Sequence, residues 1–479
     1  MKTPFIGRKN ELNALNRIWK KNTSSLIVIK GRRRIGKSRL VEEFASKYTY
    51  YVFSGIPPHS GTTAQSQRDE FSSQLRQQME YPKLQSDDWN ALFWMVNEKI
   101  SLVKKTVILF DEISWIGSKD PDFLGKLKNA WDIYFKKHPR LILILCGSAS
   151  TWVEKNILSS TGFLGRISYT LTLDELPLNE CVQFWSSKSG HIAAYEKLKM
   201  LSVTGGVPRY LEELKPDLSA EANIKDLCFI SGGLFVDEFE RIFSDLFSKR
   251  SPLYKKIVRF IAEGPSDIKT ICQHLKISQT GMIGEYLEDL KTSGFISRDF
   301  TWKIKSGMES KLSKYRLRDN YLRFYLKYIE KRLRQIHQNQ LVNITISNLP
   351  GWYSMMGMQF ENLVLNNRLW IKEQLSLDPE EIIIDNPFFQ RKTKRYKGCQ
   401  IDYMIQTKYN TLYVCEVKFS RNPVGTKVIQ EVKEKIQRLS IPRGVSCRAV
   451  LIHVNGITED LQDKDYFSNI IDFSKLLKH

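Results

Sequence analysis

The sequence predicts an α/β protein whose N-terminal part is a parallel β-sheet covered by helices on both faces. Three apolar runs of strand length carry this prediction: Ser25 to Lys30, Thr106 to Phe110 and Leu141 to Cys146. Helix-forming stretches separate them, and near-continuous apolar strands joined by helices are typical of parallel sheets buried on both sides. The chain has 479 residues. Because single cores stop growing at about 250–300 residues, we expect two or three domains.

The charge of the chain favours a polyanionic partner. Lys and Arg total 73 against 52 acidic residues, which gives a net charge of +21. Such a field attracts nucleic acid, and we expect DNA as a partner, although a merely basic protein would show the same surplus. No apolar run reaches the about 18–20 residues of a membrane span, and the N-terminus lacks a secretory segment. The seven cysteines form no CxxC pair. We therefore expect a cytoplasmic protein with no membrane partner and no zinc site.

A glycine-rich loop follows the first predicted strand and precedes a helix from about Lys37. It reads G-R-R-R-I-G-K-S and satisfies the phosphate-loop pattern G-x-x-x-x-G-K-[ST]. Glycines let backbone N–H groups approach phosphates, and the N-terminus of the following helix adds positive potential. We expect Lys37 to reach the β and γ phosphates of ATP and the Ser38 hydroxyl to bind Mg²⁺. The predicted nucleotide-binding residues of this loop are Gly31, Arg32, Arg33, Arg34, Ile35, Gly36, Lys37, Ser38 and Arg39.

Two acidic residues directly follow the second apolar strand. We expect Asp111 to hold Mg²⁺ through its water shell and Glu112 to polarise the attacking water as a general base. The third strand ends in Gly147 and Ser148. If that strand lies beside the phosphate loop, Ser148 is placed to sense the γ phosphate or to position the water. These residues predict an enzyme that hydrolyses ATP.

Several further motifs follow one another in an order that resembles the archaeal-type ATPases, a family related to AAA+ and STAND proteins. The box Phe5-Ile6-Gly7-Arg8 opens the chain, and Gly165-Arg166 and Gly205 to Tyr210 come later. The resemblance covers about the first 230 residues. It implies an AAA+-like sheet with a helical lid, Gly7 and Arg8 beside the adenine, and Pro208 near the base. It also implies an arginine finger at Arg166, in cis or from a neighbouring subunit of a homo-oligomer. A local ion pair for Arg166 stays open.

A change of pattern after about residue 250 predicts a winged helix-turn-helix. Amphipathic helices are expected at Tyr254 to Ala262, Ser266 to Leu275 and Thr280 to Ser293, followed by a hairpin. The segment from Ser278 to Lys291 would be the recognition helix, but it carries Glu285 and Glu288, which weakens a major-groove interpretation. Two roles stay open for this segment: reading DNA, and serving as a rigid spacer or protein contact.

The C-terminal block carries a second set of charged residues in apolar strands. Asp402 lies in the run from Gln400 to Gln406, and Glu416 and Lys418 lie two residues apart, so they share one face of the next strand. Glu361 is expected on a helix that starts near Met358. Two carboxylates can hold a hard divalent cation, which activates water for phosphodiester cleavage, and a lysine stabilises the developing charge.

This arrangement resembles the PD-(D/E)XK nucleases, whose fold is α/β and restriction-endonuclease-like. The resemblance implies catalytic roles for Asp402, Glu416, Lys418 and Glu361, and metal binding by Asp402 and Glu416. The strand before Asp402 lacks the proline of that motif. On the helix expected from Gly425 to Leu439, Gln430 is a candidate for positioning the site. Nearby, a run suited to phosphate contact holds Arg391, Lys392, Lys394, Arg395 and Lys397, with Tyr396 among them.

Three domains follow from these observations. We predict an ATPase with a helical lid over residues 1–230, a winged helix-turn-helix over 231–345 and a nuclease-like domain over 346–479. The leading hypothesis is an ATPase that acts on DNA through the C-terminal domain. Two alternatives stay open: an ATP-controlled switch for protein association whose nuclease-like domain is inactive, and a transcription regulator that uses the winged helix.

Overall fold

The computed structural model describes residues 4–82, 85–148, 150–247, 251–394 and 397–478. The chain forms two compact units. The first comprises residues 1–175 with 292–294, and the second comprises 176–291 with 295–479. The helices predicted to form a lid therefore belong to the second unit, which begins at Leu176. The sequence did not predict a boundary after Glu175. The predicted limits at residues 230 and 345 stay predictions.

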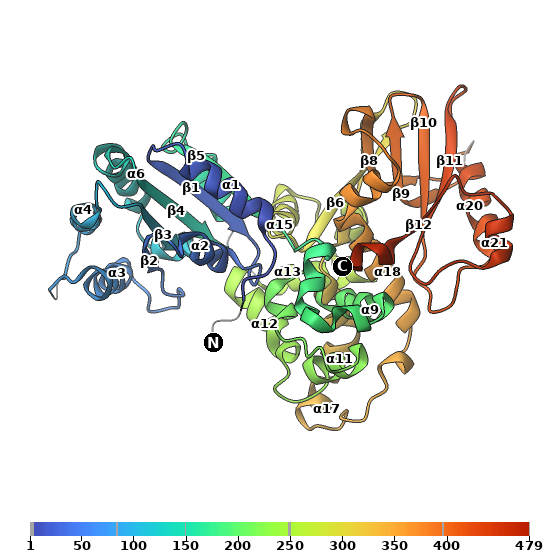
Figure 1. Ribbon diagram of the computed structural model, residues 1–479, viewed down its shortest axis with the longest axis horizontal. Helices are drawn as coiled ribbons and strands as arrows, with labels where there is room; N and C mark the ends of the chain where they lie inside the picture. The colour runs from blue at the N-terminus through green and yellow to red at the C-terminus, as the bar shows by residue number, and fades with distance from the viewer. Residues whose placement is uncertain (1–3, 83–84, 149, 248–250, 395–396, 479) are drawn as a thin grey trace. The chain divides into compact units, whose positions relative to one another are not determined.

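A parallel β-sheet forms the centre of the first unit and confirms the predicted fold class. In the described residues it has five strands in the order β2-β3-β4-β1-β5 (Figure 1). The strand that carries the acidic pair, β3, is not the direct neighbour of the phosphate-loop strand β1, because β4 lies between them. The strand that ends at Ser148 does lie beside β1, as expected. The bounds are β1 Ser25–Gly31, β2 Thr49–Ser54, β3 Thr106–Asp111, β4 Leu141–Gly147 and β5 Ile167–Leu173.

Alternating side chains of the central strands pack into two separate cores. Leu26 and Val28 of β1 join one cluster, while Ile27 and Ile29 join the other on the opposite face. This alternation explains the continuous apolar runs, since both faces of each strand are covered by helices. The covering elements are α1 Lys9–Trp19, α2 Lys37–Ala45, α3 Ala64–Met79, α4 Trp89–Lys99, α5 Ile113–Ile116, α6 Phe123–Ile133, a 3₁₀ turn Phe135–Lys137, α7 Ser150–Val153 and a π-helical turn Glu154–Leu158.

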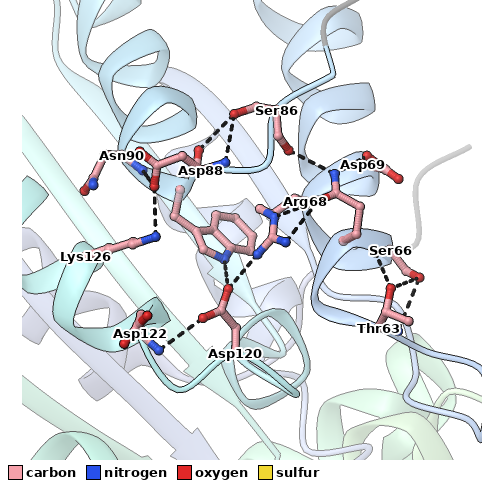
Figure 2. Close-up of polar contacts among 12 residues, drawn as sticks. Thr63, Ser66, Arg68, Asp69, Ser86, Asp88, Asn90, Asp120, Asp122 and Lys126 are labelled. Atoms are coloured by element: carbon pink, nitrogen blue, oxygen red, sulfur yellow. Dashed lines mark hydrogen bonds and ion pairs between the residues drawn. The ribbon is translucent and has the colours of Figure 1, made fainter.

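Helices α3 and α4 are inserted between β2 and β3 and are fixed by one shared carboxylate. Asp120 accepts hydrogen bonds from Arg68 of α3 at 2.7 Å and from the indole of Trp89 of α4 at 3.0 Å (Figure 2). Lys126 of α6 pairs with Asp88, the N-cap of α4, at 2.9 Å. These polar contacts orient both helices on the apolar face of the sheet, so this network has a structural role.

The second unit begins with helices and continues into three helices followed by a hairpin, the order predicted for residues 254–317. The last of the three starts at Gly281, close to the expected Thr280. The first group is α8 Leu178–Cys181, a 3₁₀ segment Val182–His191, α9 Ala194–Thr204, α10 Pro208–Leu211, α11 Ala220–Cys228 and α12 Leu234–Phe247. The second is α13 Ser251–Glu263, α14 Ile268–Leu275, α15 Gly281–Thr292, and the antiparallel strands β6 Ile296–Lys303 and β7 Met308–Leu317.

Short helical segments connect the hairpin to a C-terminal mixed sheet. The described strands follow the order β12-β11-β10-β9-β8, with β8, β9 and β10 antiparallel and β11 and β12 parallel to β10 (Figure 1). The connecting segments are α16 Asn320–Phe324, a π-helical turn Tyr325–Ile329, 3₁₀ turns Glu330–Arg332 and Ile346–Asn348, and α17 Leu333–His337. The block itself contains α18 Trp352–Asn366, α19 Arg368–Gln374, a 3₁₀ turn Pro379–Glu381, β8 Ile382–Gln390, β9 Cys399–Thr407, β10 Thr411–Val417, α20 Lys427–Arg438, β11 Ser446–His453, α21 Glu459–Asp463, β12 Asn469–Asp472 and a 3₁₀ turn Phe473–Leu477.

Two boundaries in this block differ from the prediction. The helix that carries Glu361 starts at Trp352 rather than near Met358, because Gly351 adopts a left-handed φ of 66° at its N-cap and Trp352 and Met355 are buried. Strand β10 ends at Val417, so Lys418 lies just beyond it. None of the helices in the described part of the chain combines the length and apolar character that a membrane crossing requires.

Candidate nucleotide and carboxylate sites

The phosphate loop curls around the ammonium of Lys37. Gly31 ends β1 with φ 154°, and a Cβ at this position would lie 2.5 Å from the carbonyl oxygen of Leu173. Gly36 adopts φ 85° at the N-cap of α2. Lys37 is 6% exposed, and its Nζ donates to the carbonyls of Gly31 at 2.9 Å and Arg32 at 3.1 Å. A buried ammonium held only by carbonyls is available to a phosphate group, which would bind it more strongly.

Arg8, which the family resemblance placed beside the adenine, is bonded to the phosphate loop. Its guanidinium donates to the carbonyl of Ile35 at 3.0 Å, to the carbonyl of Asp174 at 2.6 Å and to Glu11 at 3.0 Å. Gly7 precedes it with φ 76°. The arginine therefore ties the loop to the segment after β5, and the adenine contact of Gly7 and Arg8 stays a prediction. A second arginine of the loop, Arg32, pairs with Glu175 at 3.4 Å.

Ser38 and Asp111 meet as the sequence predicted. The Ser38 hydroxyl donates to Asp111 Oδ2 at 2.6 Å, although the two residues are 73 positions apart. Asp111 Oδ1 accepts the backbone N–H of Glu112 at 3.0 Å, which holds the carboxylate in place. A hydroxyl and a carboxylate at the mouth of a phosphate loop are the oxygen donors that Mg²⁺ takes in such sites. The residues present therefore fit a magnesium ion.

Glu112 is held by Ser148 from the neighbouring strand. The Ser148 hydroxyl lies 2.7 and 2.8 Å from the two carboxylate oxygens of Glu112, and its backbone N–H donates to Oε2 at 3.2 Å. Glu112 itself adopts a left-handed φ of 49° directly after β3. The sequence offered Ser148 two roles, sensing the γ phosphate or positioning the water, and the structure shows it bound to the candidate base.

Arg166 and Pro208 are two further residues that were predicted for the nucleotide site. Arg166 forms a two-point ion pair with Asp132, Nε to Oδ1 at 2.9 Å and Nη2 to Oδ2 at 2.8 Å. The guanidinium lowers the pKa of the Asp132 carboxyl to about 2. This is the local pairing that the sequence left open beside a finger role. Pro208 is the first residue of α10 and belongs to the second unit, so its place near the base stays a prediction.

The first unit is a P-loop ATPase domain with the parallel sheet of the AAA+ type. Its phosphate loop follows β1, and its acidic pair ends β3. Residues 5–214 match the family described as the ATPase domain predominantly from Archaea.

Three known proteins resemble the chain. The uncharacterized Methanocaldococcus jannaschii protein MJECL04 is 27% identical over 341 residues, which are 70% of this chain and 71% of that protein. An uncharacterized ATP-binding protein of the same organism, MJ0423, is 48% identical over 40 residues, 8% of this chain and 68% of that one. The Walker-type ATPase PABY2304 of Pyrococcus abyssi shares the fold, with a TM-score of 0.52 at 18% identity over 67% of this chain and 96% of the other.

The second unit brings the predicted carboxylates and Lys418 together. Strands β9 and β10 are antiparallel neighbours, and Asp402 Oδ2 accepts the backbone N–H of Val417 at 3.0 Å. Lys418 Nζ lies 2.9 Å from Glu416 Oε1, so the two side chains share one side as their spacing predicted. Glu416 is a buried acidic residue in the mostly apolar strand β10.

Lys435 of α20 completes this group and was not predicted. Its Nζ lies 2.5 Å from Glu416 Oε2 and 3.5 Å from Asp402 Oδ1. Gln430, the candidate that the sequence offered for positioning the site, is exposed and donates to Glu434 at 3.2 Å, so its positioning role stays a prediction. Both residues lie on α20, which is amphipathic. The charged face of this helix was the only sequence feature that could have pointed to Lys435.

Burial and mutual repulsion raise the pKa values of two acids in this group. Burial first, and then the charge of Asp402, raises the pKa of Glu361 to about 7. Burial and the charge of Glu416 likewise raise the pKa of Asp402. Although burial opposes it, attraction by Asp402 and Glu416 raises the pKa of Lys435. Three acids and two lysines therefore share one poorly solvated corner, a pattern that is common at functional sites.

A divalent cation would have to displace Lys435 from this corner. Asp402 and Glu416 supply the oxygen donors that such an ion prefers. Within the described residues, however, no three His, Cys, Asp or Glu side chains are grouped so that they could hold a metal ion. The donor chemistry fits, and the position between the two carboxylates is taken by an ammonium group.

Proposed function

We propose that the first unit hydrolyses ATP with Lys37, Ser38, Asp111 and Glu112 in the roles that their positions allow. The Lys37 ammonium exchanges its two carbonyl partners for phosphate oxygens and neutralises their charge. Ser38 and Asp111 hold the magnesium ion, which supplies further charge neutralisation when it is bound. Glu112, oriented by Ser148, accepts a proton from the attacking water. The observation that carries this proposal is the 2.6 Å contact of Ser38 with Asp111 beside the buried Lys37.

Two substitutions test the ATPase site. Lys37→Ala should abolish ATP binding, because it removes the positive charge inside the loop. Glu112→Gln should bind ATP as tightly as the unchanged protein and hydrolyse it at least about 100-fold more slowly, since a general base contributes about 10²–10⁴-fold. Lys47→Ala, an exposed lysine just after α2, is the control and should leave both properties unchanged. Unchanged turnover in both site variants would refute the proposed site.

For the second unit we propose a winged helix-turn-helix joined to a PD-(D/E)XK nuclease-like domain that acts on DNA. Three helices and a hairpin over residues 251–317 support the first part. From α18 to β11 the order is two helices, a 3₁₀ turn, three strands, a helix and a strand, which supports the second part, with Asp402 on the second of these strands and Glu416 on the third. The lysines beside them and the net charge of +21 suit a phosphodiester substrate.

Cleavage is tested with purified protein, plasmid or single-stranded DNA, and Mg²⁺ or Mn²⁺, with and without ATP. Glu416→Ala should abolish any cleavage, and Lys418→Ala should lower the rate without preventing DNA binding. Glu434→Ala is the matched control, since Glu434 is a neighbouring acid on α20 whose contacts are exposed ones with Gln430 and Arg438. Cleavage that persists in Glu416→Ala would rule out this site.

The position of Lys435 favours a second candidate function. An ammonium already neutralises Asp402 and Glu416, so the domain could serve as a nuclease-fold binding module controlled by ATP occupancy. Under this alternative the unchanged protein cleaves no DNA under any nucleotide condition. ATP binding would instead change its association with another protein, measured by size-exclusion chromatography of the Glu112→Gln variant with and without ATP.

A further inference from the structure

The hairpin of the proposed winged helix is built into the C-terminal sheet. Trp302 of β6 is 3% exposed, donates from its indole to Gln406 Oε1 at 2.7 Å, and packs edge-on against Phe388 with 5.0 Å between ring centroids. Gln406 in turn donates to the carbonyl of Ile304 at 2.7 Å. The turn is close to the sheet as well, because a Cβ on Gly307 would lie 2.5 Å from Ile383.

This packing commits one face of the hairpin to the C-terminal sheet and not to DNA. Trp302 and Ile304 share one apolar cluster with residues of β8, β9 and β10. Entering a groove of DNA would expose that cluster and leave Gln406 without its two partners, which is costly for a buried amide. The exposed side of α15 is no better suited, since Glu285 and Glu288 lie on it and repel phosphate.

The turn between β8 and β9 offers a different surface, and its base is firmly anchored. Gln390 donates to the carbonyl of Arg438 at 2.9 Å and to that of Lys397 at 2.8 Å, and accepts the backbone N–H of Ser440 at 3.0 Å. On the other side, Arg391 pairs with Asp267, the N-cap of α14, at 2.9 Å. Of the basic run in the sequence, Arg395 and Tyr396 lie outside the described residues.

Three lysines of this turn are available to an anion. Lys392, Lys394 and Lys397 are exposed, and within the described part of the chain none of them forms an ion pair. Arg391 differs from them, because Asp267 already neutralises it. The three lysines therefore project an unbalanced charge of about +3 from a fixed base, which suits the regularly spaced phosphates of a nucleic-acid strand.

The same turn lies beside the carboxylate corner. Cys399, the first residue of β9, donates from its thiol to the carbonyl of Lys435 at 3.3 Å. The side chain of Lys435 contacts Glu416 and Asp402. Cys399 therefore joins the end of this turn to the helix whose Lys435 contacts the two acids.

We infer that Lys392, Lys394 and Lys397 form the surface by which the second unit holds the sugar-phosphate backbone of DNA. This inference deepens the function proposed for the second unit. It assigns positioning of DNA to these three lysines, and it makes the helices and hairpin of residues 251–317 a rigid support. The contacts are to phosphates, so binding carries no sequence preference.

Two matched charge reversals in the full chain test the inference. The turn variant is Lys392→Glu with Lys394→Glu and Lys397→Glu. The hairpin variant is Lys303→Glu with Lys305→Glu and Lys311→Glu, three exposed lysines of the proposed wing. Both variants change the net charge equally, so any difference between them reflects position and not overall charge. The measurement is fluorescence anisotropy with labelled duplex and single-stranded DNA, in EDTA, over a range of salt concentrations.

The turn variant should bind DNA at least about tenfold more weakly, and the slope of log affinity against log salt should become shallower by about 2–3. The hairpin variant should bind like the unchanged protein. A loss of DNA affinity in the hairpin variant equal to or larger than that in the turn variant overturns the inference, and so does an unchanged turn variant.

If the turn variant does not fold, as judged by ATP turnover and thermal unfolding, the same three lysines are changed to Gln. This variant should lose less DNA affinity in the same direction, and no loss overturns the inference. Binding is measured without metal, so an inactive nuclease site leaves the result intact.

Discussion

Lys435 Nζ lies 2.5 Å from Glu416 Oε2 and occupies the position between Glu416 and Asp402 that a divalent cation would need. The side chain of Lys435 is 27% exposed and extends from α20, so it can withdraw without unfolding the helix. A divalent cation bound at the proposed site would therefore compete with this ammonium for the same two carboxylates.

Replacing this ammonium should make the site depend on metal. Lys435→Met keeps a long side chain and removes the charge, which leaves two buried acids facing each other. Without metal we expect a loss of about 2–3 kcal/mol in unfolding free energy, somewhat less than the about 3–5 kcal/mol for breaking a fully buried pair. Mn²⁺ should then raise the melting temperature of Lys435→Met by more than it raises that of the unchanged protein, because a ligand of the folded state stabilises it.

Arg438→Ala is the control for this experiment. Arg438 lies one turn further along α20 and pairs with Glu434 at 3.2 Å on the surface. Its loss should change stability by less than about 1 kcal/mol, as for most surface ion pairs, and should not alter the response to Mn²⁺. Equal Mn²⁺ responses in Lys435→Met and the unchanged protein would show that the ammonium and the metal do not share a position.

Ser148→Ala should separate the binding of ATP from its hydrolysis. Without the hydroxyl, Glu112 loses the contacts of 2.7 and 2.8 Å that orient its carboxylate. We expect kcat to fall about tenfold with the Kd for ATP unchanged within about twofold, because positioning of a general base acts on the chemical step. Ser148→Thr retains the hydroxyl and should restore most of the rate. A rise in Kd at unchanged kcat would instead support direct contact of Ser148 with the nucleotide.

The sequence was sufficient for features that depend on local pattern. The run from Ser25 to Lys30 and the glycines after it specify strand β1 and the phosphate loop, since few other structures suit that order. Period-two spacing was enough to place Glu416 and Lys418 on one side. The sequence predicted less well those features of the site that depend on tertiary packing. Gln430 and Lys435 lie on the same helix, but five residues turn the helix by about 140°, so only the packing of α20 shows which one faces the acids.

Long-range contacts account for the other differences. The partner of Arg166 is Asp132, 34 residues earlier, and nothing in the local sequence favours this ion pair over a catalytic role. The boundary after Glu175 depends on which helices share a core, and the apolar residues from Leu176 onward pack with those of the C-terminal half. Composition does not change at this point of the chain, so a sequence pattern cannot locate it.

The ion pair between Asp132 and Arg166 should make the stability of the fold depend on pH. Arg166 lowers the pKa of Asp132 from its ordinary 3.8 to about 2. A carboxyl whose pKa is lower in the folded state stabilises the fold above pH 3.8, and this stabilisation is lost as the pH falls toward 2. Between about pH 4 and 2, urea unfolding should show the unchanged protein losing its advantage over Asp132→Asn. Arg166→Ala should remove most of the difference, and Lys128→Ala, which removes a weaker partner at 2.9 Å, should remove less.

The same two variants decide whether Arg166 serves catalysis. If the pair is structural, Asp132→Asn and Arg166→Ala leave ATP turnover unchanged. If Arg166 acts as a finger, Arg166→Ala lowers kcat at least about 100-fold, whereas Asp132→Asn, which releases the arginine, does not. Turnover measured over a range of protein concentrations would also show whether the arginine comes from a second subunit.

Gln359 of α18 should be essential to the stability of the second unit, because it joins three segments within that unit. Its side chain is fully buried, donates to the carbonyls of Ser202 at 2.9 Å and Asn320 at 2.6 Å, and accepts from Arg323 at 2.8 Å. Gln359→Leu keeps the volume but leaves two carbonyls and a guanidinium with fewer partners. We expect the free energy of unfolding to fall by about 2–4 kcal/mol, since each unsatisfied buried polar group costs about 1–3 kcal/mol.

The control is Gln335→Leu, at an exposed glutamine on α17, which should change the free energy of unfolding by less than about 0.5 kcal/mol. Urea unfolding followed by tryptophan fluorescence measures both, and similar midpoints for the two variants would show that helix α9 and helix α18 are not held together by this residue.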